Sequence, residues 1–180
     1  PEDILSRPRS LGDDLRDVLE KTDIHFVLNL PITEKFKQTA MESGSRAREI
    51  IGKEIQADVY QTRTFFAKTP LYYLDVFYEE SDGRKIRIFD EVYPDDLLWR
   101  DVHMAVYGWA SQELVERLQK EGLVKKNIIF IDNEVFASLP TGRFPDALHM
   151  HINHTIFTPG LYPPHVASFE LMGLPENLRH

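Results

Sequence analysis

The stretch that decides the fold reads Asn127-Ile-Ile-Phe-Ile-Asp-Asn-Glu-Val-Phe136, followed after a short link by Leu148-His-Met-His-Ile-Asn-His-Thr-Ile-Phe-Thr-Pro-Gly160. Each apolar run ends in polar residues, Asp-Asn-Glu in the first and Asn-His-Thr in the second. This pattern is typical of buried parallel strands that deliver side chains to a crevice at their carboxyl ends. Four of the seven histidines lie in or just after the second run, so chemistry is expected here.

Composition limits the class of protein. The chain has 180 residues, 42% of them hydrophobic, which suits one folded domain. A flexible lead-in is predicted for residues 1–10, which are polar and carry two prolines, and a single α/β domain for residues 11–180. The net charge of −8 repels a phosphate backbone, and no run is apolar enough to span a membrane, so neither nucleic acid nor a membrane is the expected partner. Without cysteine there is no thiolate metal site, a cytoplasmic location is expected, and an oligomer is compatible with the sequence.

The remaining pattern predicts an α/β fold in which helices flank a parallel or mixed sheet. A β-hairpin is predicted at about residues 71–90, because Asp82-Gly83 suits a tight turn between two alternating runs. Strands are predicted near residues 24–30, 55–66, 71–78, 85–90, 127–132 and 148–157.

Two helices are predicted between these strands. Thr33 would cap a helix from Glu34 to about Glu49, although Ser43-Gly44-Ser45 leaves two shorter helices as the alternative. A long helix is predicted from about Leu97 to Glu121, opened by Pro94-Asp95-Asp96. The basic residues Arg84, Lys85 and Arg87 are expected to form a solvated face of the hairpin.

A His-x-His pair stands in the second apolar run. On a strand, His149 and His151 would share one face and could bind a divalent metal with a third ligand. The candidates for that ligand are Asp132, Glu134 and His165. The alternative is that both histidines are structural and bond to neighbouring groups.

The polar ends of the two runs form a second candidate site. The carboxylate and amide groups of Asp132, Asn133 and Glu134 could hold the hydroxyls of a polar ligand, or could simply cap a helix. His154 follows Asn153 and precedes Thr155. Because its ordinary pKa lies near neutrality, His154 could hydrogen-bond a ligand hydroxyl or transfer a proton, or it could be structural.

Several segments carry a resemblance. Thr69-Pro-Leu-Tyr-Tyr-Leu-Asp75 is similar to a "vPLYLLDT" strand, Ile129-Phe-Ile-Asp-Asn-Glu134 to "vyHLNE", and Ile152-Asn-His-Thr-Ile-Phe-Thr-Pro-Gly160 to a "tNHT" strand and turn. Residues 87–93 resemble an "r-I-t-d-r-L-Y" segment, and the helix 97–121 resembles the one that follows it. All five segments resemble the α-glucan (glycogen, starch and maltodextrin) phosphorylases, and their order along the chain is the same as in that family, over about residues 50–175.

The resemblance implies a function in carbohydrate metabolism. The chain would be the sugar-binding part of the N-terminal half of a two-domain glycosyltransferase of the GT-B type, and inactive alone. His154 would contact the transferring sugar as the catalytic residue, with Asn133, Glu134, Asn153 and Thr155 binding the α-glucan substrate. Pyridoxal phosphate would be held by a lysine of the second domain and not by this chain. Two other classes stay open: a small stand-alone metalloenzyme, a hydrolase or isomerase with a divalent metal on His149 and His151, and a non-catalytic binding module.

Overall fold

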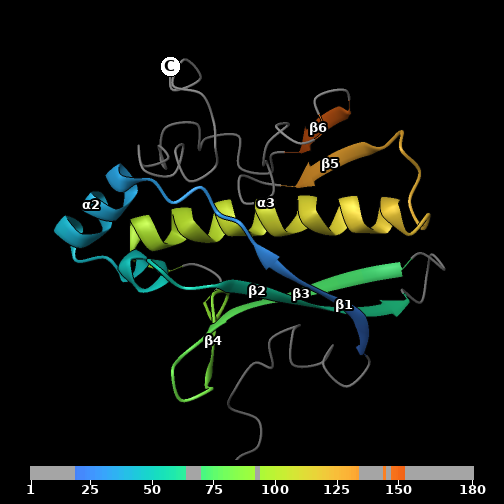
Figure 1. The fold of residues 1–180 in the computed structure, drawn as a ribbon. Helices are drawn as coiled ribbons and strands as arrows, with labels where there is room; N and C mark the ends of the chain where they lie inside the picture. The colour runs from blue at the N-terminus through green and yellow to red at the C-terminus, as the bar shows by residue number, and fades with distance from the viewer. Residues whose placement is uncertain (1–18, 64–69, 92–93, 134–143, 145–146, 153–180) are drawn as a thin grey trace, which may run out of the picture.

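The computed structural model describes residues 19–63, 70–91, 94–133, 144 and 147–152, which have a mixed α/β fold (Figure 1). The predicted lead-in and the ends of two predicted strands, at residues 64–66 and 153–157, lie outside these ranges. The elements are β1 (Glu20–Leu28), α2 (Glu34–Ser43), the 3-10 helix η1 (Arg46–Ile50), β2 (Ile55–Arg63), β3 (Pro70–Glu79), β4 (Lys85–Arg87), α3 (Leu97–Lys120), β5 (Ile129–Asn133) and β6 (Leu148–Ile152).

The six described strands form two sheets. Strands β1 to β4 form a four-stranded antiparallel sheet in chain order, whereas β5 and β6 form a separate parallel pair. The α/β class is confirmed, but the prediction of one parallel or mixed sheet is wrong for the described strands. For β3 and β4 the physical reason is the short turn between them, because a short turn can join antiparallel neighbours but not parallel ones.

The predicted hairpin is confirmed in β3 and β4. Its turn is closed by backbone hydrogen bonds from the Glu80 amide to the Arg84 carbonyl at 3.0 Å and from the Gly83 amide to the Glu80 carbonyl at 2.9 Å. Gly83 has a φ of 80°, a conformation that glycine adopts without strain. The Asp82 carboxylate accepts a hydrogen bond from the Arg84 amide at 3.0 Å, so the turn residues act as their chemistry predicts.

The region after β1 contains two short helices instead of one. The Thr33 hydroxyl caps α2 by accepting a hydrogen bond from the Phe36 amide at 3.1 Å, as predicted. The α-helix does not continue to Glu49, because Gly44 takes a φ of 66° and its amide bonds back to the Met41 carbonyl. A left-handed residue ends an α-helix, and the chain continues as η1, so the alternative of two shorter helices is confirmed.

Replacing Gly44 with alanine is expected to lower the free energy of unfolding by about 1 kcal/mol. A Cβ added there meets nothing within 4 Å, so the cost comes from the positive φ and not from a clash. Urea unfolding of Gly44→Ala measures it, with Gln38→Ala on the exposed face of α2 as the control. A change no larger in Gly44→Ala than in Gln38→Ala would contradict the account.

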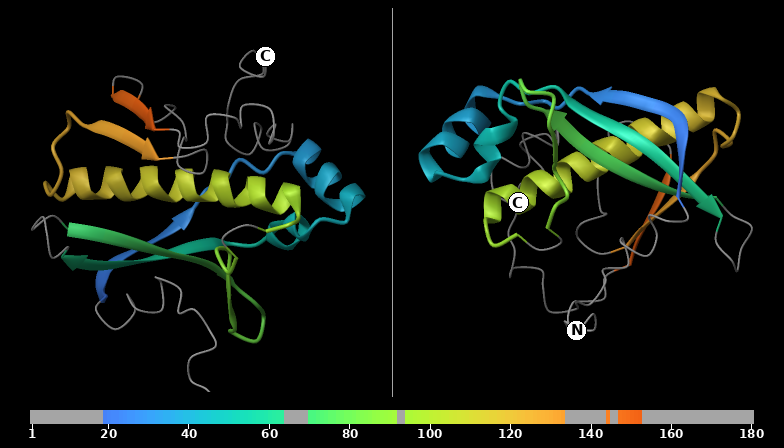
Figure 2. Two further views of the ribbon diagram at one scale, coloured as in Figure 1. Left: turned by 180° about the vertical axis from the view of Figure 1, so that it is seen from behind. Right: turned by 90° about the horizontal axis from the view of Figure 1, so that it is seen from below.

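Helix α3 begins and ends close to the predicted residues and runs between the two sheets (Figures 1 and 2). Its inner face packs on the four-stranded sheet in a core that includes Phe26, Val59, Val76, Val102 and Val106. The successive residues 101–105 are all buried, so this part of the helix is covered on every side. No helix in the described ranges has both the length and the apolar character needed to cross a membrane.

One face of the β5–β6 pair is apolar and exposed. It carries Ile129, Ile131, Leu148, Met150 and Ile152, with exposed fractions from 43% to 62%. These strands were predicted to be buried, and the described residues correct that prediction for this face. The run of apolar residues specifies strands, but burial on both faces requires another layer of structure.

Candidate functional site

The predicted site lies where β5 and β6 end. The Cα partners across this parallel pair are Asp132 with His151 and Asn133 with Ile152. Both carboxyl ends therefore reach the same edge, a usual location for ligands in open α/β sheets. The prediction that the two apolar runs are adjacent parallel strands is confirmed for the residues within the described ranges.

The individual site residues fall only partly within those ranges. Asn133 is the last residue of β5, and His149 and His151 belong to β6. Their partners in the predicted sites lie outside the described residues: Glu134, Asn153, His154, Thr155 and His165. The catalytic, sugar-binding and metal-binding roles therefore stay predictions.

His149 packs against an aromatic ring. Its imidazole stacks on Phe130, with ring centroids 4.8 Å apart and planes inclined by 8°. Phe130 also contacts the ring of Phe144, at a centroid distance of 5.2 Å. Within the described part of the chain, no three His, Cys, Asp or Glu residues are grouped so that they could hold a metal ion. The metal site thus depends on a third ligand that remains a prediction.

A second polar cluster lies on the outer face of the four-stranded sheet, the face turned away from the core. Alternation along β2 buries Ala57 and Val59 in the core and turns Asp58 and Tyr60 outward. Asp58 and Asp75 are Cα partners on β2 and β3, and both are buried, with exposed fractions of 3% and 7%. Two adjacent buried carboxylates require compensating charge, which the surrounding basic residues supply.

Three basic side chains contact Asp58. Its carboxylate is 2.9 Å from Lys21 Nζ, 2.9 Å from His25 Nδ1 and 3.2 Å from Lys85 Nζ. Burial acts to raise the pKa of Asp58, but the hydrogen bonds from Lys21, His25 and Lys85 outweigh it and lower this pKa to about 2. Asp58 is therefore ionised at neutral pH and cannot act as a general acid there.

Asp75 is paired with Arg87. The guanidinium donates to both carboxylate oxygens, from Nε at 2.8 Å and from Nη2 at 3.2 Å. This two-point pair fixes the orientation of both side chains, and its hydrogen bonds raise the pKa of Arg87. Next to it, Lys85 Nζ lies 3.8 Å from the ring centroid of Phe77, a cation–π contact.

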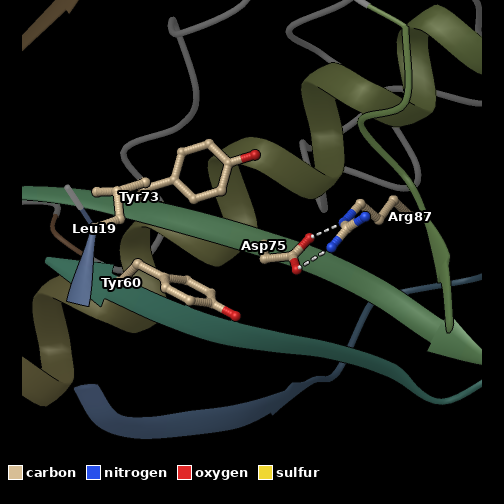
Figure 3. Close-up of a pocket in the computed structure, with 5 residues that line it drawn as sticks. All are labelled: Leu19, Tyr60, Tyr73, Asp75 and Arg87. Carbon is tan, nitrogen blue, oxygen red and sulfur yellow. Dashed lines mark hydrogen bonds and ion pairs between the residues drawn. The ribbon is translucent and has the colours of Figure 1, made fainter. Parts of the chain in front are cut away.

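A cavity of about 210 Å³ adjoins this ion pair, and Leu19, Tyr60, Tyr73, Asp75 and Arg87 line it (Figure 3). The two tyrosine rings meet edge to face, with centroids 6.3 Å apart and planes at 66°. The cavity combines aromatic surface with one fixed ion pair, an arrangement that suits binding of a small polar molecule.

Patterning in the sequence did not predict this cluster. Arg84, Lys85 and Arg87 are all exposed, as expected for a solvated hairpin face, but Lys85 and Arg87 also bind the two buried carboxylates. The missed signal was that Asp58 and Asp75 occupy outward positions on neighbouring strands, beside outward basic residues of the next strand. Adjacent outward charges of opposite sign predict pairing across strands.

Comparison with known proteins finds no family model, curated protein or solved structure that matches this chain. The resemblance to the α-glucan phosphorylases therefore rests on the collinear motifs alone. A functional conclusion must come from the two sites described above.

Proposed function

We propose that this chain is the sugar-binding half of an α-glucan phosphorylase-like glycosyltransferase of the cytoplasm. The observation that carries the proposal is the in-register parallel pairing of β5 and β6, which brings Asn133 beside Ile152 at one edge. The residues that follow these two positions are those assigned to the sugar, so one binding site can draw on both strand ends.

The order of the elements also supports the proposal. Residues 70–75 of the first motif fall in β3, the helical motif is α3, and Asp132 and Asn133 of the Asp-Asn-Glu motif end β5. The exposed apolar face of β5 and β6 is larger than scattered surface hydrophobics would explain, and such faces often mark contact with another domain or chain. A half-enzyme that joins a second domain would bear such a face.

The proposed chemistry is reversible transfer of a glucosyl group between an α-glucan and phosphate. His154 would contact the transferring sugar, and Asn133 and Glu134 would hold its hydroxyls, with Asn153 and Thr155 beside them. Fixed dipoles that stabilise charge developing on the sugar would supply the rate enhancement. The phosphate would be bound by the second domain.

The pyridoxal phosphate of such an enzyme does not fit the described lysines that have resolved partners. Lys21, Lys37, Lys53 and Lys85 all lie within 3.2 Å of carboxylate oxygens, and the hydrogen bond to Asp58 raises the pKa of Lys21. A Schiff base requires an uncharged amine, which such pairing opposes. We assign no step to the cofactor within this chain.

Titration of the chain with maltoheptaose, followed by amide NMR, tests the proposal. We expect saturable shifts at Asn133 and Ile152, and about tenfold weaker binding in Asn133→Ala, because a lost hydrogen bond to a sugar hydroxyl costs about that much. Asn127→Ala, two residues before the start of β5, is the matched control and should bind normally. Cellohexaose, which has β-linkages, should cause no shifts at Asn133 and Ile152.

Three results would speak against the proposal. If maltoheptaose does not shift the amide signals of Asn133 and Ile152, the proposed sugar site is wrong. Stoichiometric zinc binding that shifts His149 and His151, and that His149→Ala abolishes, would favour the metalloenzyme. If the chain responds to neither maltoheptaose nor zinc, the non-catalytic binding module remains as the interpretation.

A further inference from the structure

The described lining of the outer-face cavity is electrically balanced. Of the five described residues that line it, only Asp75 and Arg87 are charged, and they neutralise each other through two hydrogen bonds. A neutral lining offers no excess attraction to an anion or a cation, so a neutral ligand suits it best. The volume of about 210 Å³ is below the roughly 300–1,000 Å³ of drug-sized ligand sites, which favours a single small ring.

The Asp75–Arg87 pair presents donors and acceptors in fixed positions. Each carboxylate oxygen of Asp75 accepts one hydrogen bond from Arg87 and retains a further lone pair. The Arg87 side chain is 53% exposed, so its remaining N–H groups can reach a ligand. A rigid unit of this kind matches two adjacent hydroxyls and loses little entropy on binding.

The two tyrosines complete the lining. Figure 3 shows both phenol hydroxyls directed toward the end of the cavity where Asp75 and Arg87 lie, and neither is bonded to another lining residue. Tyr73 is 42% exposed, a large aromatic surface open to solvent. A tyrosine offers an apolar ring face and a polar tip, which complement the apolar C–H face and the hydroxyls of a sugar ring.

We propose that this cavity is a saccharide site that binds one neutral pyranose unit between Tyr73 and the Asp75–Arg87 pair. It belongs to the outer face of the four-stranded sheet, whereas the site of the proposed function lies at the ends of β5 and β6. The two sites use different residues, so each stands or fails by itself.

The test is an amide NMR titration of the full chain with the methyl α-pyranosides of glucose, galactose and mannose. We expect at least one of them to produce saturable shifts at Tyr60, Tyr73 and Asp75. Inorganic phosphate at the same concentrations should leave these amides unshifted.

Variants assign the binding to named groups. Tyr73→Ala should weaken binding about tenfold, and Tyr73→Phe, which keeps the ring, should weaken it less. Tyr107→Ala is the matched control, because Tyr107 on α3 is a similarly exposed tyrosine at 44% and should leave binding unchanged. Asn133→Ala should also leave it unchanged, which separates this site from the one proposed above.

Three outcomes would overturn the proposal. The first is the absence of shifts with all three pyranosides, and the second is binding that Tyr73→Ala leaves intact. The third is a shift of the same amide signals by phosphate together with competition between phosphate and the sugar, which would identify the cavity as an anion site.

Discussion

Acidification from pH 7 to pH 4 is expected to remove about 3 kcal/mol of unfolding free energy through His103 alone. His103 lies on α3 and is only 5% exposed. Burial lowers its pKa from 6.5 to about 4, with Arg46 acting in the same direction and Asp90 opposing it. The unfolded chain therefore takes up a proton near pH 6.5, while the folded protein stays neutral at this residue until about pH 4.

The surroundings of His103 explain why the proton is excluded. Its ring meets Trp99 and Phe89 edge on, at centroid distances of 4.9 and 5.4 Å. Its Nε2 is buried and has no hydrogen-bond partner among the described residues, as is true of Trp99 Nε1. A proton added at Nε2 would create a buried charge next to aromatic rings, with no acceptor for the new N–H group. Such a charge costs several times more free energy than the same charge in water.

Urea unfolding of the wild type and of His103→Gln between pH 7 and pH 4 measures the effect. Over this interval the unfolding free energy of the wild type should fall by about 3 kcal/mol more than that of His103→Gln, whatever the difference in stability between them at pH 7. Asp58 contributes little to the stability change between pH 7 and pH 4. Because its pKa is about 2 in the folded protein, the stabilisation it provides is lost below about pH 4. Parallel curves for the wild type and His103→Gln would show that His103 does not carry the effect.

The elements predicted correctly from sequence are those whose signals are local. The turn of the hairpin is specified by Asp82 and Gly83, and the start of α3 by the acidic residues that precede it. Each of these signals acts over a few residues, through a side chain or a φ angle that nothing distant has to supply. The same holds for Thr33, which caps α2 as expected.

The features that sequence did not predict depend on partners far along the chain. Nothing within β5 or β6 indicates that they pair apart from the other four strands. Likewise, alternation predicts that Lys85 points outward. It does not predict that Lys85 pairs with the buried carboxylate of Asp58, 27 residues away in the sequence. For the strand-end site, the sequence predicted the parallel pairing of β5 and β6 but not the exposure of their apolar face. An apolar run specifies a strand, but it does not specify which layer of structure covers that strand.

Replacing Asp96 with alanine is expected to lower the free energy of unfolding by about 3 kcal/mol. Its carboxylate is the N-cap of α3 and accepts a hydrogen bond from the Trp99 amide at 3.0 Å. It also accepts from the Ser45 hydroxyl at 2.8 Å and from the Arg46 amide at 2.7 Å, next to η1. One side chain therefore joins the first turn of the long helix to the segment that follows α2.

The cost exceeds that of an ordinary cap because three donors lose a charged acceptor together. Burial acts to raise the pKa of Asp96, but the hydrogen bonds from Trp99, Ser45 and Arg46 prevail and lower it, which shows that they favour the ionised form. Ser45 is itself only 6% exposed, so its hydroxyl has little access to water once the carboxylate is removed. A cap alone is worth about 1 kcal/mol, and hydrogen bonds to a charged group are worth about 1.5–3 kcal/mol each without being additive.

Urea unfolding at pH 7 measures this cost, with Asp95→Ala as the matched control. Asp95 is exposed and one residue away, so its removal changes the net charge equally without breaking these hydrogen bonds and should shift stability by no more than about 0.5 kcal/mol. Asp96→Asn keeps a capping oxygen but loses the charge, and it should fall between the two, at a cost of about 1 kcal/mol. Equal stabilities for Asp96→Ala and Asp95→Ala would mean that the hydrogen bonds of Asp96 between η1 and α3 contribute no more than a surface charge does.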